Sequence, residues 1–216
     1  MTEDDRPSLP EDHRESWRRT YSENSYRSLP WFSPRASAWV RRGVEAGWIR
    51  PGSRVLDLGC GAGTNAIYLA RSGFRTCGID LAPGAIDAGR ARARRAGLSI
   101  EFRVGDALQL PYERGTFGGL TDIGCFHTLP RALRPAYARE LSRVLRPGGR
   151  YLLSWVAREH TEERGPPHRP SVEEVAGAFE REFQFRQVEF LPETPSSIMA
   201  YGAVLERRRQ PQPLTR

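Results

Sequence analysis

One segment, residues 55–64, constrains the fold of this chain more than any other. It reads Val-Leu-Asp-Leu-Gly-Cys-Gly-Ala-Gly-Thr. An apolar run that suits a buried strand passes directly into a glycine-rich turn, and a helical pattern begins at Thr64. Glycine has no Cβ, so such a turn lets the backbone approach a ligand closely. This order of elements is typical of open parallel sheets that bind nucleosides at the carboxyl ends of their strands.

Along the rest of the chain, β-rich runs alternate with helical patterns, which indicates a parallel sheet covered by helices. The predicted strands are Arg54–Leu58, Arg75–Ile79, Ile100–Val104, Phe117–Ile123, Tyr151–Val156, Phe183–Phe190 and Ile198–Leu205. The predicted helices are Ser33–Gly47, Thr64–Ser72, a helix from Pro83 that stops before Gly97, Arg131–Leu145, and a helix from the capping box of Ser171 and Glu174 to Phe179. We expect an α/β fold with a Rossmann-like doubly wound sheet of seven strands. The sheet is expected to be mostly parallel, with an antiparallel C-terminal hairpin strand and helices on both faces.

The 216 residues fit one domain. We expect a disordered N-terminal tail over residues 1–15 and a single domain over 16–206, with a helical cap at about 16–50. Residues 207–216 are expected to form a disordered, Arg-rich tail. No apolar run approaches the roughly 20 residues that cross a bilayer, and the N-terminus lacks a secretory apolar core. We therefore expect a cytoplasmic protein without a membrane partner.

The net charge of +7 raises the question of a nucleic-acid partner. Every Lys/Arg position is Arg, which indicates a composition bias across the whole chain rather than a local binding surface. The densest runs, Arg90–Arg95 and Arg207–Arg209, fall on a predicted helix face and in the predicted tail. Charge runs of this kind are usually solvated faces. The charge pattern therefore argues against a nucleic-acid partner.

The three cysteines, Cys60, Cys77 and Cys125, leave an odd count and form no CxxC pair. We expect reduced thiols and neither a disulfide framework nor a metal site.

Asp80 lies at the end of the second predicted strand, 21 residues after Gly59. A carboxylate at this place can accept both hydroxyls of a ribose. Dinucleotide sites use G-x-G-x-x-G with a pyrophosphate at the helix N-terminus, whereas here the spacing is G-x-G-x-G and Asp57 precedes it. That carboxylate would repel a pyrophosphate and attract a sulfonium amino acid with its ammonium group. The charge favours a cationic nucleoside cofactor.

These residues resemble the class I S-adenosylmethionine-dependent methyltransferases, whose signature here is E/D-x-G-x-G-x-G. The resemblance covers about residues 30–205. Asp80 matches the family's ribose-binding acid, and residues 105–107 match its GDA motif, in which the Asp contacts the adenine amino group. Residues 145–149 match its L-x-P-G-G turn.

The resemblance implies S-adenosylmethionine as cofactor and S-adenosylhomocysteine as product. The cofactor residues that it implies are Asp57, Gly59, Cys60, Gly61, Gly63, Asp80, Leu81, Asp106, Ala107 and Asp122. For Asp122, a role in positioning the following loop is an open alternative.

In this family the acceptor lies over the ends of strands four and five, under an N-terminal segment. Residues 121–137 resemble small-molecule methyltransferases of the thiol, halide and tellurite-resistance type, with D-x-G-x-F-H followed by R-x-x-Y. Residues 29–32 resemble their N-terminal Trp segment. The N-P-P-[YF] motif of amino-directed nucleic-acid methyltransferases is absent. The candidate substrate-binding residues are Tyr26, Trp31, Phe32, Phe126 and His127.

His127 is also the candidate catalytic group, as a base or an orienting group. The alternative is a histidine that bonds backbone and fixes its loop, and the aromatic candidates could serve packing alone. We expect methyl transfer in line to a sulfur, nitrogen or oxygen of a small molecule, with no metal. An RNA or protein methyltransferase, a non-catalytic cofactor binder and an NAD-linked oxidoreductase are the alternatives. The acceptor and a homodimer are left open.

Overall fold

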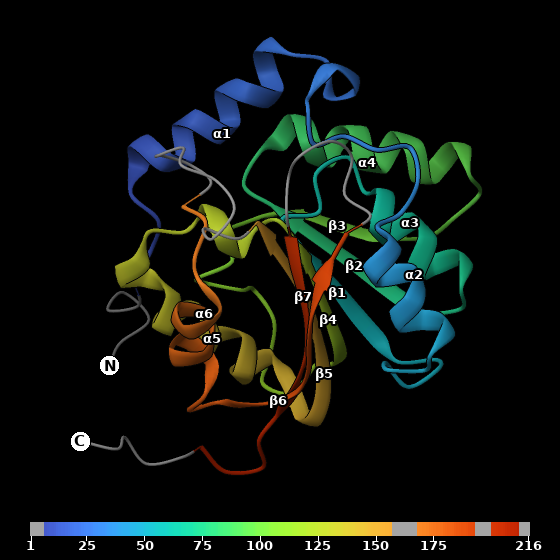
Figure 1. Ribbon diagram of the computed structural model, residues 1–216. Helices are drawn as coiled ribbons and strands as arrows, with labels where there is room; N and C mark the ends of the chain where they lie inside the picture. Colours follow the sequence, from blue (N-terminus) through green and yellow to red (C-terminus); the bar gives the residue numbers. More distant parts are fainter. Residues whose placement is uncertain (1–6, 157–167, 193–199, 212–216) are drawn as a thin grey trace.

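The computed structural model describes residues 7–156, 168–192 and 200–211. The described chain forms a seven-stranded sheet in the order β3-β2-β1-β4-β5-β7-β6 (Figure 1). The strands are β1 (Arg54–Leu58), β2 (Arg75–Asp80), β3 (Glu101–Val104), β4 (Phe117–Ile123), β5 (Leu145–Val156), β6 (Phe183–Leu191) and β7 (Ala200–Arg207). The first five strands run parallel, and β7 pairs antiparallel with both of its neighbours. This confirms the predicted fold class.

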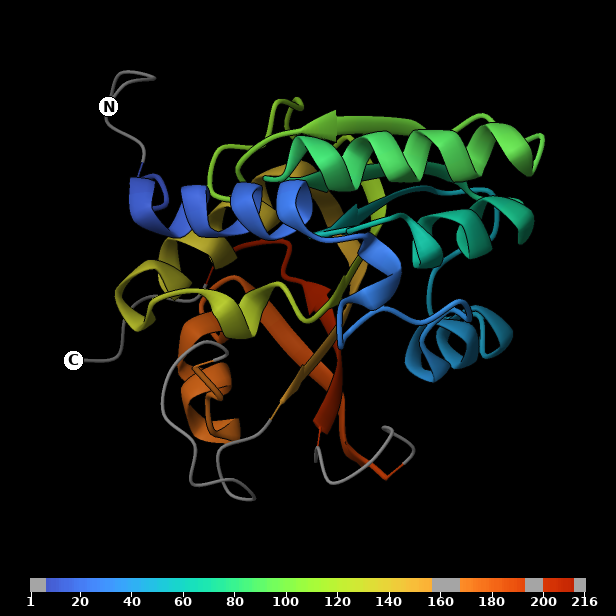
Figure 2. The ribbon, with the colours of Figure 1, turned by 90° about the horizontal axis from the view of Figure 1, so that it is seen from above.

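Helices cover both faces of the sheet. On one side lie α2 (Ala38–Glu45), α3 (Thr64–Arg71) and α4 (Pro83–Arg95), and on the other lie α5 (Arg134–Val144) and α6 (Val172–Phe179) (Figures 1 and 2). A further helix, α1 (Glu11–Glu23), lies outside these two layers and contacts α4. It is amphipathic but has no fully buried residue.

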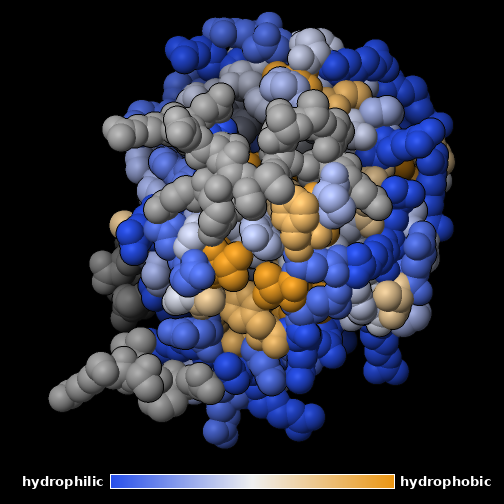
Figure 3. Space-filling model, in the orientation of Figure 1, coloured by the Kyte–Doolittle hydropathy of each residue, from blue (hydrophilic) through white to orange (hydrophobic). Residues whose placement is uncertain are grey.

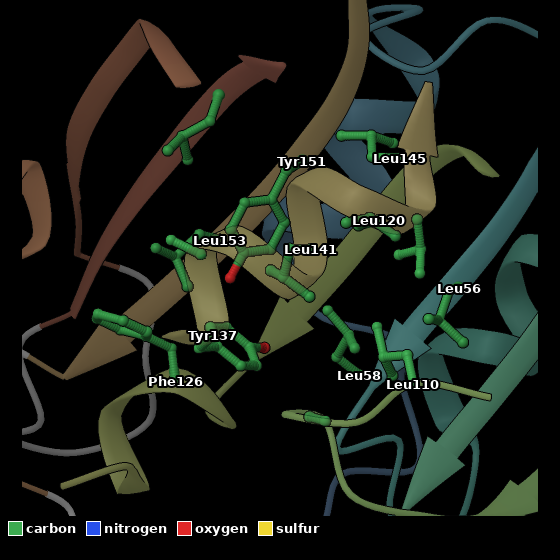
Figure 4. Packing of buried hydrophobic residues seen from close by; sticks show 14 of the residues in the cluster. Leu56, Leu58, Leu110, Leu120, Phe126, Tyr137, Leu141, Leu145, Tyr151 and Leu153 are labelled. Carbon is green, nitrogen blue, oxygen red and sulfur yellow. The ribbon is translucent and has the colours of Figure 1, made fainter. Parts of the chain in front are cut away.

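The alternation of side chains along β1 explains the two layers. Leu56 and Leu58 pack into the cluster that joins the sheet to α5 and α6, and Val55 packs with Trp39 of α2 on the opposite face. Figure 4 shows the first cluster, in which Tyr137 of α5 lies among leucines of the sheet. Because both faces of β1 are buried, its sequence is apolar almost throughout, as is usual for parallel strands.

Several boundaries differ from the predictions. The helix α1 begins at Glu11, inside the stretch expected to be a disordered tail. The helix expected from Ser33 begins at Ala38. The turn at residues 146–149 lies within β5, as an irregularity between the pairs Phe117↔Leu145 and Gly119↔Arg150. Parts of the two predicted tails, and the predicted start of the last strand at Ile198, lie outside the described residues.

The capping box was predicted correctly. The Ser171 hydroxyl accepts a hydrogen bond from the Glu174 N–H at 3.2 Å, and the Ser171 N–H donates to the Glu174 carboxylate at 3.1 Å.

Candidate cofactor and acceptor site

The glycine turn after β1 requires glycine at each of its three predicted positions. Gly59, Gly61 and Gly63 have φ values of +56°, +51° and +76°, in the left-handed region. A Cβ on Gly59 would lie 2.7 Å from the Cys125 Cβ, and one on Gly63 would lie 2.7 Å from the Phe102 ring. The turn is thus packed against its neighbours, while the helix α3 starts directly after it.

Asp80 ties the end of β2 to this turn. Its Oδ2 accepts a hydrogen bond from the Gly61 N–H at 2.9 Å, and its Oδ1 accepts one from the Ala82 N–H at 3.0 Å. Burial raises the pKa of the carboxyl group, and these backbone donors oppose the rise. The side chain is only partly buried, and the half-buried Leu81 follows it. Asp80 and the glycine turn therefore lie together, as the spacing predicted.

Asp57 presents an unmatched acceptor below the turn. The residue is 1% exposed, and its Oδ1 accepts a hydrogen bond from the Thr121 hydroxyl at 2.7 Å. Its Oδ2 is buried and has no hydrogen-bond partner of normal geometry among the described residues, although the Ala66 backbone N–H interacts with the carboxyl group and lowers its pKa. Burial raises the pKa of Asp57 to about 7, and the negative charge of Asp122 contributes to the rise. A buried acceptor without a donor is rare in a folded protein, so this oxygen fits a cationic or hydrogen-bonding ligand.

Asp106, the predicted adenine contact, is bound by the N-terminal segment. Its Oδ2 accepts hydrogen bonds from the Leu9 N–H at 3.0 Å and from Arg14 Nη2 at 3.2 Å. Its Oδ1 accepts one from the Leu108 N–H at 2.8 Å, and the neighbouring Ala107 is buried. Both N-terminal partners were unexpected, because residues 1–15 were predicted to form a disordered tail. The acidic first turn after Pro10 was the available signal for a helix there.

Tyr21 of α1 lies against the glycine turn. A Cβ on Gly61 would lie 2.9 Å from the Tyr21 hydroxyl oxygen, and that oxygen accepts a hydrogen bond from Trp31 Nε1 at 3.2 Å. Burial and the charge of Asp80 raise the pKa of Tyr21, which keeps the hydroxyl protonated. Trp31 is 53% exposed and packs edge-on against Trp17. Helix α1 therefore extends from Asp106 to the glycine turn, across the carboxyl edge of the sheet (Figure 2).

The other two N-terminal aromatic candidates lie against α4. The rings of Tyr26 and Phe32 pack edge to face, with centroids 5.1 Å apart. The Arg92 guanidinium lies 5.7 Å from the first ring and 5.4 Å from the second. The structure therefore gives both rings a packing role on the α4 side of the molecule, which was the alternative to substrate contact.

Asp122 anchors the loop after β4. It is fully buried and accepts hydrogen bonds from the Cys125 and Phe126 N–H groups and from the hydroxyls of Tyr137 and Tyr151, at 2.7, 3.1, 2.7 and 3.0 Å. Burial raises its pKa to about 6, and these four donors oppose the rise. Four donors of the chain thus surround a carboxylate that has no exposed surface, which leaves no room for a ligand group. The geometry supports the loop-positioning role over the cofactor contact.

Phe126 belongs to the core. Its side chain is fully buried and packs against Phe179 and Tyr137, with ring centroids 5.0 and 6.0 Å apart (Figure 4). This burial argues against the predicted substrate contact, because the 3₁₀ turn over residues 126–128 directs this ring inward.

His127 is held as a neutral hydrogen-bond donor. Its Nδ1 accepts a hydrogen bond from the Val156 N–H at 3.0 Å, so the ring proton is on Nε2. Burial lowers its pKa to about 4, and the positive charges of Arg169 and Arg134 lower it further. Nε2 faces Gly124, where it would lie 3.4 Å from an added Cβ. This geometry argues against the predicted base and matches the alternative, a histidine that bonds backbone and fixes its loop.

Two further histidines, given no role by the sequence analysis, lie on the same side. The His168 N–H donates to the His127 carbonyl at 2.7 Å. Nε2 of His13, on α1, accepts a hydrogen bond from Trp17 Nε1 at 3.2 Å. Burial lowers the pKa of His13, and the nearby His168 lowers it further. Helix α1, the loop after β4 and the segment before α6 therefore meet on the acceptor side.

The remaining features are reported for the described residues alone. Cys60, Cys77 and Cys125 are free thiols, and burial raises the pKa of each. No three His, Cys, Asp or Glu side chains in these segments are grouped so that they could hold a metal ion. None of the described helices has both the length and the apolar character needed to span a bilayer.

Known proteins share the central part of the chain. Residues 55–149 match a family model described as a methyltransferase domain. The 2-heptyl-1-hydroxyquinolin-4(1H)-one methyltransferase of Mycobacteroides abscessus is 33% identical over 125 residues, which are 57% of this chain and 54% of that protein. The fatty-acid O-methyltransferase of Mycolicibacterium smegmatis is 42% identical over 106 residues, which are 48% of this chain and 37% of that protein. The chain thus spans only about half, or less, of the length of these relatives.

Solved structures share the fold over nearly the whole chain. A structure described as "Conversion of a Disulfide Bond into a Thioacetal Group during Echinomycin Biosynthesis" superposes with a TM-score of 0.79 at 24% identity. The match covers 90% of this chain and 92% of that one. The family match covers the glycine turn, Asp57 and Asp80, and the solved structure shows that the fold is shared.

Proposed function

We propose that the protein is a methyltransferase that transfers a methyl group from S-adenosylmethionine to a sulfur, nitrogen or oxygen atom of a small molecule. The observation that carries this proposal is the unmatched Oδ2 of Asp57, buried beside a turn built for close approach of a ligand. Bound S-adenosylmethionine would supply an activated methyl group together with two positive charges, one on sulfur and one on its ammonium. That charge suits Asp57 and would not suit a pyrophosphate.

The residues of the site divide the recognition among them. Asp80 would accept the ribose hydroxyls, and the glycine backbone would lie against the amino-acid part. Asp106 would receive the adenine amino group, at a carboxylate that Leu9 and Arg14 already hold in place. Tyr21 would close the site from above, because its hydroxyl already lies over Gly61.

On the acceptor side, His127 would have a hydrogen-bond donor at Nε2. It has no free nitrogen that could act as a base, because Nδ1 accepts the Val156 N–H. A neutral imidazole with its proton on Nε2 can donate a hydrogen bond to the acceptor and orient it. It does not readily take a proton, so the arrangement favours nucleophiles that ionise by themselves near neutral pH. Thiols, N-hydroxy groups and carboxylic acids are of this kind. The two relatives are named for a hydroxyquinolinone and for fatty acids, which have such groups. The D-x-G-x-F-H resemblance to thiol methyltransferases supports the same class.

We also propose a cellular location for the protein and a segment that covers its site. We place the protein in the cytoplasm, where its three thiols would stay reduced. The N-terminal segment would serve as the cap over the site. The cap would begin with α1, at Glu11, and not at about residue 16 as the sequence predicted. The proposal needs neither a homodimer nor a nucleic-acid partner.

Calorimetric titration tests the cofactor. S-adenosylmethionine and NADH would each be titrated into wild type, Asp80→Ala and the control Asp87→Ala, whose exposed carboxylate on α4 only meets Arg90. We expect binding of S-adenosylmethionine alone, lost in Asp80→Ala and kept in the control. Binding of NADH, or of neither compound, would refute the proposal. An acceptor screen that detects S-adenosylhomocysteine then separates an enzyme from a non-catalytic binder.

A further inference from the structure

A cavity opens on the outer side of α2, α3 and α4, away from the predicted cofactor residues. Its volume is about 640 Å³, and Thr64 at the start of α3 is its nearest approach to the glycine turn. None of the predicted cofactor residues lines it. Figure 3 shows that this side of the molecule is largely hydrophilic.

Six guanidinium groups from separate parts of the chain line this cavity. They belong to Arg27, Arg35, Arg41, Arg71, Arg92 and Arg95. No Asp or Glu is among the lining residues. In residues 7–156, where all six lie, none of them forms an ion pair with a carboxylate. The cavity, which we call the arginine cavity, is therefore an uncompensated positive site.

The positive charge is built into the fold at Arg92. Its Nη1 donates to the Ala62 carbonyl at 2.6 Å and to the Thr64 hydroxyl at 2.8 Å, so the side chain is fixed rather than solvated. Burial lowers the pKa of Arg92, and the positive charges of Arg27 and Arg95 lower it further, whereas Tyr26 opposes the fall. Like charges are thus held close together, and this arrangement costs free energy unless an anion joins them.

We propose that the arginine cavity binds a small ligand bearing two or more linked phosphate groups. The planar guanidinium fork matches phosphate oxygens in a bidentate way, and six arginine residues line this one cavity. A volume of about 640 Å³ lies within the range of small-ligand sites. The site is separate from the methyl-transfer chemistry and does not depend on it.

Two features favour a small ligand over single-stranded nucleic acid. Nucleic-acid grooves use exposed aromatic rings as platforms on which successive bases stack. Two aromatic residues line the cavity, Tyr26 and Tyr68, and the Tyr26 ring already contacts Arg27 at 5.3 Å and Arg92 at 5.7 Å, as well as Phe32, so at most one ring is left for a base. The arginines also surround one cavity rather than follow a long track.

Calorimetric titration with tripolyphosphate tests the proposal at near-physiological salt. The variants are Arg71→Gln and Arg95→Gln, which remove cavity arginines from two helices, and the matched control is Arg94→Gln. Arg94 is exposed and adjacent to Arg95 but does not line the cavity. We expect one tripolyphosphate per chain in wild type, binding about tenfold weaker in each cavity variant, and unchanged binding in the control.

Three results would overturn the proposal: no saturable binding of tripolyphosphate, an equal loss in Arg94→Gln, or binding of oligouridylate that tripolyphosphate does not displace. Circular dichroism checks that each variant is folded. Titration of the same variants with S-adenosylmethionine keeps this test apart from the proposed function, because Arg71→Gln and Arg95→Gln should leave that binding unchanged.

Discussion

The buried carboxyl group of Asp57 couples the stability of the free protein to the binding of its cofactor. Burial raises the pKa of Asp57 from 3.8 to about 7. The folded state therefore holds this proton more tightly than the unfolded state does. Stability contributed at this residue falls as the pH rises from about 4 to about 7, because folding must then be achieved with a desolvated charge.

The substitution Asp57→Asn removes that charge and keeps an acceptor for the Thr121 hydroxyl. Each pKa unit is worth about 1.4 kcal/mol, so the ionised carboxylate costs the free protein up to about 4 kcal/mol above pH 7. We expect Asp57→Asn to be more stable than wild type by about 2 to 4 kcal/mol at pH 8, and by clearly less at pH 5. The affinity for S-adenosylmethionine should change in the opposite direction and fall at least about tenfold, because a charge-assisted contact is lost.

Urea unfolding at pH 5 and pH 8, followed by calorimetry at pH 8, measures both effects. Asp87→Asn serves as control, since that carboxylate is exposed and should give no pH-dependent gain. The free energy of unfolding of Asp57→Asn and of wild type could differ by the same amount at pH 5 and at pH 8. Ionisation of a buried Asp57 carboxyl group would then not contribute to that difference. If the affinity is unchanged, Asp57 does not face the cofactor.

Three further expectations follow from the same contacts. Phe126→Ala should lower the free energy of unfolding by about 3–5 kcal/mol in urea, since it empties a core position; a loss within about 0.5 kcal/mol would place the ring outside the core. Gly61→Ala should lose about 1–2 kcal/mol of stability at its positive φ and also bind S-adenosylmethionine more weakly, because the new Cβ meets the Tyr21 hydroxyl; unchanged calorimetry would contradict this. The rate of methyl transfer should show no ionisation of His127 between pH 5.5 and 8, since its pKa is about 4, and a pKa near 6.5 that disappears in His127→Gln would refute the lowered pKa of this residue.

The order of elements and the core of the cofactor site were predictable because they depend on local sequence. An apolar strand followed by three glycines allows few backbone paths, and Asp80 follows the turn at a spacing set by one helix and one strand. The predicted bounds of β1 and β4 match the structure residue by residue.

The acceptor side was not predictable in the same way, because its residues are assigned by contacts distant in sequence. Whether Asp122 meets a ligand or a loop depends on Tyr137 and Tyr151, which come from a later helix and strand. The same holds for Phe126, whose neighbour Phe179 is 53 positions away. Arg92 was expected on a solvated face, yet from α4 it bonds to the Ala62 carbonyl in the glycine turn.

The Asp122 contacts also bear on how the selectivity of this protein could be altered by directed evolution. They join the loop of His127 to the main core, so substitutions in that loop would change folding and substrate choice together. Helix α1, by contrast, has no fully buried residue. Substitutions there away from Tyr21 and Arg14 should leave stability nearly constant. A mutant library placed on the exposed positions of α1 would therefore sample new acceptors while most of its members still fold.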